Sequence, residues 1–351
     1  MDLASGVTIA IVKIGEIYFI RERDRIDGGS SSYVKIGMVK DISRNSEERL
    51  LDHQTGNPRD LELHHVTQTP GPFRVERFLH QQFGPRRVRS EWFQLSDEEL
   101  SLAVQAAERL AREAFVHVPI MEAAGELGSV ISSSEKITPT EESTEWIRIL
   151  GNAKEALKLC RELADTYKTV ATDLPTEVRA EVELEELIVT EHYLEKKFDA
   201  EGFDAAYPGL LGQYTEVSVS VNGRFTPTFP AIDLAEFDRE LMEFRTEFLD
   251  ACDQVRRGTL AFGELFDIWQ ILERYMGSYS WDADVADAHL RVICGASAGI
   301  EGQVTWNRTA KEKKSLESDR LESDHPEKYN KFVTVNTLTR LKTQRRARRT
   351  V

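Results

Sequence analysis

The sequence lacks the features that mark secreted, disulfide-stabilised or membrane-spanning proteins. Its 351 residues include only three cysteines, Cys160, Cys252 and Cys294, which are too far apart to form a metal-binding pair or a disulfide framework. The apolar N-terminal run at residues 7–14 is shorter than a signal-peptide core. It is also far shorter than the roughly 20 residues that span a membrane. These absences predict a cytoplasmic protein without a membrane partner.

An excess of basic charge, which is common in nucleic-acid-binding proteins, is also missing. The net charge is −15, from 45 Lys and Arg against 60 Asp and Glu. However, residues 1–95 contain 14 basic and 13 acidic residues, so the acidity lies further along the chain. Residues 338–351 contain six basic and no acidic residues, which suits phosphate contact or, equally well, a solvated disordered end. The charge distribution therefore does not exclude a nucleic-acid partner.

The first part of the chain has the pattern of a small α+β domain. Three β-rich runs lie at residues 17–20, 33–38 and 61–67. Three helical patterns lie at residues 43–54, 72–83 and 96–115. Ser96 and Glu99 have the spacing of a capping box at the start of the third helix. This order predicts an antiparallel three-stranded sheet flanked by helices.

Composition divides the chain into four predicted segments. They are an α+β domain at residues 1–120, a linker at 121–143, a mainly α-helical region at 144–305 and a polar, basic tail at 306–351 whose composition is compatible with disorder. Helical patterns in the third segment lie at residues 145–170, 177–198, 234–257 and 262–276. Alternation of residue type around Asn222 and Gly223 predicts one β-hairpin with a type I′ turn.

Five polar side chains in the first domain are candidates for chemistry. Lys35 lies within an apolar strand, Tyr18 lies in the strand before it, and Arg49 lies on the first helix. Glu76 and His80 are four residues apart and share one face of the second helix. If these side chains converge, they suit phosphodiester hydrolysis, with a carboxylate holding Mg²⁺ or Mn²⁺ and an arginine offsetting phosphoryl charge. Taken singly, each has an ordinary structural explanation, such as strand packing for Tyr18 or an edge-strand position for Lys35.

Short motifs follow one another in a specific order along residues 8–95. They are Gly15-Glu-Ile-Tyr18, Lys35-Ile-Gly37, Arg49-Leu50, Gln54-Thr-Gly-Asn-Pro58, Glu76 with His80, and Glu91-Trp-Phe93. In this combination, about a quarter of the chain resembles the T5orf172-like branch of the GIY-YIG nuclease superfamily. The resemblance implies a divalent-metal-dependent DNA endonuclease of the kind that serves phage defence or a mobile element.

The resemblance also implies roles for the matching residues. Tyr18 orients or deprotonates the attacking water, and Arg49 lies at the scissile phosphate. Glu76 is the carboxylate that binds Mg²⁺ or Mn²⁺. Lys35, which assists the nucleophile or the phosphate, stands where the wider superfamily has a tyrosine. His80 either hydrogen-bonds the nucleophile or Glu76, or has a structural role.

Three further positions, Tyr33, Gly37 and Glu91, belong to the comparison with the superfamily pattern. Tyr33 precedes Lys35 by two residues and projects from the same face of the strand. Gly37 ends the second motif, where a side chain would crowd the site or a turn requires glycine. Glu91 stands near the position at which many relatives have an asparagine. These differences affect the details of the mechanism more than the class of reaction.

A basic run, Arg86, Arg87 and Arg89, follows the second helix and is the best candidate for contact with backbone phosphates. A solvated loop is the alternative. Three hypotheses for the whole chain therefore remain open. The first is a DNA endonuclease. The second is a nucleic-acid-binding module on the same scaffold with little cleavage. In the third, the helical region forms a homo-oligomer or binds a partner protein, and the nuclease acts when recruited.

Overall fold

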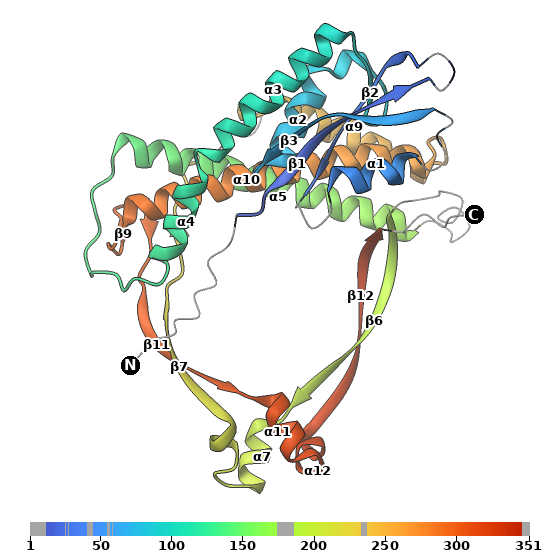
Figure 1. The fold of residues 1–351 in the computed structure, drawn as a ribbon. Coiled ribbons are helices and arrows are strands. Elements are labelled where there is room, and N and C mark those ends of the chain that lie inside the picture. The colour runs from blue at the N-terminus through green and yellow to red at the C-terminus, as the bar shows by residue number, and fades with distance from the viewer. Residues whose placement is uncertain are drawn as a thin grey trace.

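The computed structural model describes residues 12–24, 26, 28–40, 45–54, 57, 59–173, 186–232 and 237–345. Within these ranges the chain forms an N-terminal α+β domain, a body of long helices, and two β-ribbons (Figure 1). The ribbons leave the helical body at separate places and meet at a small tip (Figure 1). This arrangement joins segments that are far apart in the sequence.

The N-terminal sheet, as far as the structure describes it, has five antiparallel strands in the order β3-β1-β2-β5-β4. The strands are β1 (Gly15–Arg23), β2 (Ser30–Val39), β3 (Asp60–Thr69), β4 (Arg87–Arg89) and β5 (Trp92–Gln94). The α+β class is confirmed, but the predicted three-stranded sheet was wrong. Strands β4 and β5 have only three residues each, and such short runs carry no periodic signal in the sequence.

Helices cover both faces of this sheet. They are α1 (Ser46–Gln54), α2 (Pro72–Gln82) and α3 (Asp97–Phe115), with a short 3-10 helix η1 (Gly84–Arg86) after α2. Ile17 and Phe19 of β1 pack in one cluster with buried residues of α2 and α3. Tyr18 and Ile20 point to the opposite face, where α1 packs. The capping box predicted at Ser96 is confirmed.

The helical body has one large apolar core. Its helices are α4 (Val118–Leu127), α5 (Glu141–Asp173), α9 (Arg239–Arg256) and α10 (Phe262–Cys294). The helices predicted over residues 145–170, 234–257 and 262–276 are therefore confirmed, although residues 234–236 lie outside the described ranges. No helix in the described ranges is both long and apolar enough to cross a bilayer.

The first β-ribbon replaces the predicted hairpin. Strand β7 (Thr215–Asn222) pairs along its length with β11 (Thr309–Leu316). The residues after it form β8 (Thr226–Pro227), which pairs with β10 (Val304–Thr305), itself next to β9 (Gly299–Ile300). A Cβ atom at Gly223 would lie 2.3 Å from the carbonyl oxygen of Asn307. This glycine therefore permits a close approach of a distant backbone segment, and the predicted type I′ hairpin was wrong.

The second β-ribbon pairs β6 (Glu186–Phe198) with β12 (Val333–Arg345). The helix predicted over residues 177–198 was wrong for residues 186–198, because pairing with β12 overrides the local helical charge pattern. Residues 177–185 lie outside the described ranges. The tip consists of α7 (Ala200–Ala206), η2 (Leu211–Tyr214), α11 (Ser318–Asp324), α12 (Pro326–Tyr329) and η3 (Asn330–Phe332) around a small aromatic core.

The predicted C-terminal tail thus includes β11, the last helices of the tip and β12. Arg346, Arg348 and Arg349 of its basic end lie outside the described ranges.

Helix α10 joins the N-terminal domain to the helical body by packing against α2. Arg77 of α2 donates a hydrogen bond to Asp238 at 3.1 Å, and its guanidinium lies 4.2 Å from the ring centre of Tyr275. Tyr279 donates a short hydrogen bond to the same Asp238. The junction is therefore buried, charged and aromatic, and it holds α10 in one position on the domain.

Helices α2 and α10 approach each other most closely at Gly277 of α10. A Cβ atom at this position would lie 2.1 Å from Cγ of Phe73 in α2. Gly277→Val is therefore expected to lower the free energy of unfolding by about 1–3 kcal/mol through overpacking. Urea unfolding followed by circular dichroism measures this change. The matched control is Gly212→Val, because a Cβ at Gly212 meets no described atom within 4 Å. Equal effects of the two substitutions would contradict the tight junction.

Candidate active site

A buried ion-pair network lies where α2, β2 and α10 meet. It consists of Lys35, Glu76, Glu91 and Arg274. Lys35 Nζ lies 2.6 Å from Glu91 Oε2, and Arg274 Nη2 donates to Glu91 Oε1 at 2.9 Å. Arg274 Nε donates to Glu76 Oε2 at 3.1 Å. Two carboxylates and two cations therefore form one network, in which Arg274 and Glu76 are 198 residues apart in sequence.

The two carboxylates of the network differ in their titration. Glu76 is only 2% exposed, and burial raises its pKa to about 7, against the opposing effect of Arg274. Burial also acts to raise the pKa of Glu91, but Lys35 and Arg274 together hold that pKa well below its usual range. The two pKa values differ because Glu91 contacts two cations, Lys35 and Arg274. Glu76 contacts only Arg274, which it shares with Glu91. Glu76 is thus the carboxylate whose charge is less well compensated.

His80 lies one turn after Glu76 on α2 and is also buried. Its Nε2 donates a hydrogen bond to the carbonyl oxygen of Ile36 at 2.9 Å, which ties α2 to the strand next to Gly37. Its Nδ1 is buried with no hydrogen-bond partner among the described atoms. Burial holds the pKa of His80 well below its usual range, so the ring is neutral at pH 7. His80 therefore positions β2 in this structure and does not contact Glu76 through its bonded nitrogen.

Tyr18 and Lys35 come from neighbouring strands and share one face of the sheet. Tyr18 pairs with Gly37, and Ile20 pairs with Lys35, so the two polar side chains are one residue pair apart along that face. A Cβ atom at Gly37 would lie 2.5 Å from the Tyr18 hydroxyl. Glycine at position 37 therefore leaves room for the tyrosine ring. The hydroxyl of Tyr18 also lies 3.4 Å from Nε2 of His53 on α1.

Arg49 lies on the same helix as His53, α1. Its guanidinium is 3.8 Å from Asp52, and about a fifth of its side chain is exposed. Arg49 therefore forms an ion pair with a residue of its own helix, α1, whereas Glu76 forms one with Arg274 of α10. Lys35 contacts Glu91, and Arg274 links Glu91 to Glu76. Tyr18 shares the sheet face of Lys35, but the polar contacts described for Tyr18 and Arg49 are with residues of α1.

The three arginines after α2 have different environments. Arg86 is exposed and forms an ion pair with Glu99 at 2.8 Å, and Arg89 is exposed on β4. Arg87 is partly buried and donates to the carbonyl oxygen of His80 at 3.2 Å. Arg86 and Arg89 are therefore accessible to a phosphate backbone, while Arg87 stabilises the turn after α2. Tyr33, on the same strand as Lys35, is 39% exposed.

Sequence reasoning missed Arg274. It lies within the buried face of α10, between Leu272 and Tyr275, and is itself only 6% exposed. A single arginine inside an apolar and aromatic helical pattern was the available signal. Its partners, however, lie in another domain and are not visible from the pattern of α10.

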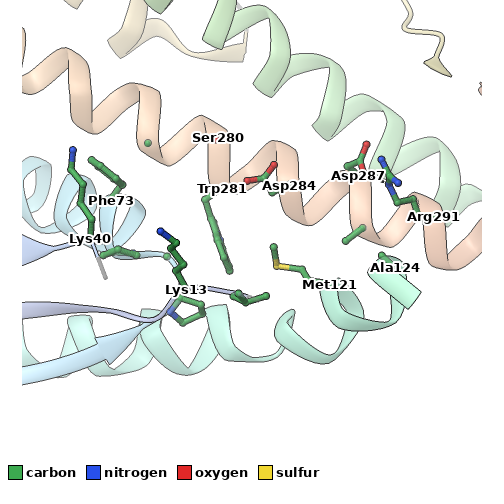
Figure 2. Close-up of a pocket in the computed structure, with 17 residues that line it drawn as sticks. Lys13, Lys40, Phe73, Met121, Ala124, Ser280, Trp281, Asp284, Asp287 and Arg291 are labelled. Carbon is green, nitrogen blue, oxygen red and sulfur yellow. Dashed lines mark hydrogen bonds and ion pairs between the residues drawn. The ribbon is translucent and has the colours of Figure 1, made fainter. Parts of the chain in front are cut away.

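A cavity of about 650 Å³ also lies at the junction between the N-terminal domain, α4 and α10. Figure 2 shows Lys13 and Lys40 toward one end, Trp281 in the middle, and Asp284 and Arg291 toward the other end. The described residues that line it include no member of the buried ion-pair network. The cavity and the network are therefore separate features of the same junction.

Comparison with known families decides the nature of the N-terminal domain. Residues 15–112 match the family model of the T5orf172 domain, and these residues include β1 through most of α3. Residues 15–112 are a T5orf172 domain. This domain is GIY-YIG-like and nuclease-associated, so the N-terminal region of the chain is nuclease-like or DNA-binding. No curated protein and no solved structure matched the chain.

The T5orf172 domain contains Lys35, Glu76 and Glu91 of the network, whereas Arg274 comes from outside it. The described residues include no group of three or more His, Cys, Asp or Glu side chains that could hold a metal ion. In addition, the Glu76 carboxylate already accepts a hydrogen bond from a cation, Arg274. The residues in this arrangement therefore do not fit a bound divalent cation.

Proposed function

We propose that the T5orf172 domain is a DNA endonuclease that hydrolyses phosphodiester bonds and requires Mg²⁺ or Mn²⁺ at Glu76, in phage defence or in a mobile element. What supports the proposal is that a domain of a nuclease-associated family contains Glu76 and Lys35 in one network. DNA is the proposed substrate, and the proposed compartment is the cytoplasm. The helical region is proposed to mediate a homo-oligomer or to bind a partner protein.

The proposed roles follow the chemistry of the side chains. Tyr18 orients or deprotonates the attacking water. Arg49 offsets the charge that develops on the phosphoryl oxygens, and Lys35 adds a second positive charge near the reacting phosphate. His80 acts as a positioning residue through the Ile36 carbonyl. Arg86 and Arg89 are proposed to contact backbone phosphates, which fix the position of the duplex without reading its sequence.

A second candidate is a nucleic-acid-binding module that does not cleave. The observation that favours it is the pairing of Glu76 with Arg274, since a carboxylate paired with a buried arginine is a poorer ligand for a metal ion. The presence of Tyr18, Lys35, Arg49 and Glu76 in one domain favours the endonuclease. A scaffold that only bound DNA would have no need for this combination.

The test is cleavage of supercoiled plasmid by the full chain with Mg²⁺, with Mn²⁺ and with EDTA. Nicking or linearisation with either metal, abolished by EDTA, is the expected result once Glu76 is free of Arg274. The Arg274→Gln variant is assayed in parallel, so that a neutralised Glu76 does not conceal the activity. DNA binding without cleavage by both proteins would overturn the endonuclease and support the binding module.

A further inference from the structure

Arg274 reaches the T5orf172 domain from a separate part of the chain. It lies on α10, many of whose buried apolar residues belong to the core of the helical body. Its guanidinium donates to both Glu76 and Glu91, and Lys35 completes a network of two positive and two negative charges. A guanidinium that serves two carboxylates in a buried site is held by geometry as well as by charge.

Arg274 and a divalent cation compete for the same carboxylate. Mg²⁺ and Mn²⁺ bind carboxylate oxygens directly at about 2 Å. Arg274 Nε already occupies Oε2 of Glu76 at 3.1 Å, and the positive guanidinium would repel a second cation at this distance. Glu76 is also 2% exposed, so neither a hydrated cation nor a DNA phosphate reaches it in this structure. Pairing with Arg274 and burial of Glu76 therefore both lower the affinity of this carboxylate for a divalent cation.

The position of Arg274 is set by the junction around it. Three residues further along α10, Gly277 packs directly against Phe73 of α2. One residue further than Arg274, Tyr275 stacks under the guanidinium of Arg77, which itself pairs with Asp238. Since α2 also contains Glu76, the same contact surface aligns Arg274 with the carboxylate. The pairing is thus a consequence of how the helical body docks on the domain.

We propose that Arg274 is an autoinhibitory residue that occupies the metal-binding carboxylate of the T5orf172 domain and keeps the nuclease inactive while α10 is docked. The inference rests on the proposed function, because it assigns a regulator to that same site. The helical body then regulates the nuclease, since it supplies the arginine that pairs with the carboxylate of the proposed catalytic site.

The experiment measures Mn²⁺ binding to the full chain in the absence of DNA, by electron paramagnetic resonance of the free ion. Arg274→Gln is expected to raise the Mn²⁺ affinity at least tenfold over the wild type. The gain is expected to vanish in Arg274→Gln combined with Glu76→Gln. Arg256→Gln is the matched control, because it removes one exposed positive charge from the neighbouring helix α9. It is expected to leave the affinity within twofold of the wild type.

Removal of Arg274 leaves two carboxylates with one cation, which can unfold the junction. Thermal unfolding of each variant is therefore measured first. If Arg274→Gln does not fold, the combination of Arg274→Gln with Glu91→Gln removes one charge of each sign. That variant leaves Glu76 and Lys35 as the remaining charged residues of the network, and it is expected to show the same Glu76-dependent gain.

Two results would overturn the proposal. One is an unchanged Mn²⁺ affinity in the folded Arg274 variants. The other is a gain that persists when Glu76 is also replaced. The assay separates this inference from the proposed function. A Glu76-dependent gain in Mn²⁺ affinity without plasmid cleavage by any variant would support the competition at Glu76 and reject the endonuclease. Metal-dependent cleavage by the wild type, with no gain on replacing Arg274, would support the endonuclease and reject autoinhibition.

Discussion

Glu76→Gln is expected to reduce metal-dependent plasmid cleavage by about 10³-fold or more. The proposed reaction requires a charged oxygen ligand for Mg²⁺ or Mn²⁺, and loss of one preorganised electrostatic group at a reacting phosphate costs about 10²–10³-fold by itself. A glutamine retains the shape and one oxygen of the side chain but removes the negative charge. The rate of plasmid nicking is measured in the wild-type chain and again in the Arg274→Gln background, where the carboxylate is not paired with the guanidinium.

The fold is expected to tolerate this substitution. Burial raises the pKa of Glu76 to about 7, so the folded protein already disfavours the charged form at this position. Arg274 keeps its second partner, Glu91, when Glu76 is neutral. Glu98→Gln is the matched control, because Glu98 is an exposed glutamate of α3 in the same domain. If Glu76→Gln cleaves the plasmid at the same rate as this control, the assignment of Glu76 to the active site is wrong.

Arg49→Ala is expected to reduce cleavage by about 10³-fold, as is typical of arginines that stabilise a phosphoryl transition state. The contact of Arg49 with Asp52 spans 3.8 Å, so little is lost when a phosphate replaces Asp52 as its partner. Arg49→Lys retains the positive charge without the planar pair of donors, and it is expected to have an intermediate rate. Single-turnover cleavage at saturating protein separates this effect on the chemical step from weaker DNA binding.

Arg112→Ala provides the comparison for Arg49→Ala. Arg112 is also a helix arginine of the T5orf172 domain with a weak ion pair, 4.0 Å from Glu108, but its side chain is 72% exposed. It is expected to keep the wild-type rate of cleavage and to show only a small change in DNA affinity. If the two alanine variants have the same single-turnover rate, Arg49 has no role in the chemical step.

The elements of the N-terminal domain were predictable where local patterns are long enough to read. Strands β1 and β2 alternate around a polar loop, α2 begins at Pro72, and α3 begins with the capping box at Ser96. Strands β4 and β5 were not predictable, because three residues cannot establish a period. The turn between them contains Glu91, so the position of this carboxylate also depended on strands that the pattern does not reveal.

The ribbons of the helical region show a second limit. Residues 186–198 have helix-like charge spacing, yet they form β6 because β12 pairs with them over 13 residues. Asn222 and Gly223 have the composition of a hairpin turn, yet β7 pairs with β11, which begins at Thr309. In both cases a partner far along the chain supplies the hydrogen bonds, and tertiary context outweighs local preference.

The sequence by itself determined the T5orf172 domain, its α+β class and the side chains available for chemistry, because these depend on short motifs and on local periodicity. Tertiary structure alone decided that Glu76 is buried against Arg274, a residue 198 positions away on a helix of another region. The physical reason is that an ion pair in a protein interior depends on which surfaces pack together. The packing of α10 against α2 depends on the whole fold. Neither helix contains a periodic pattern or a motif that predicts it.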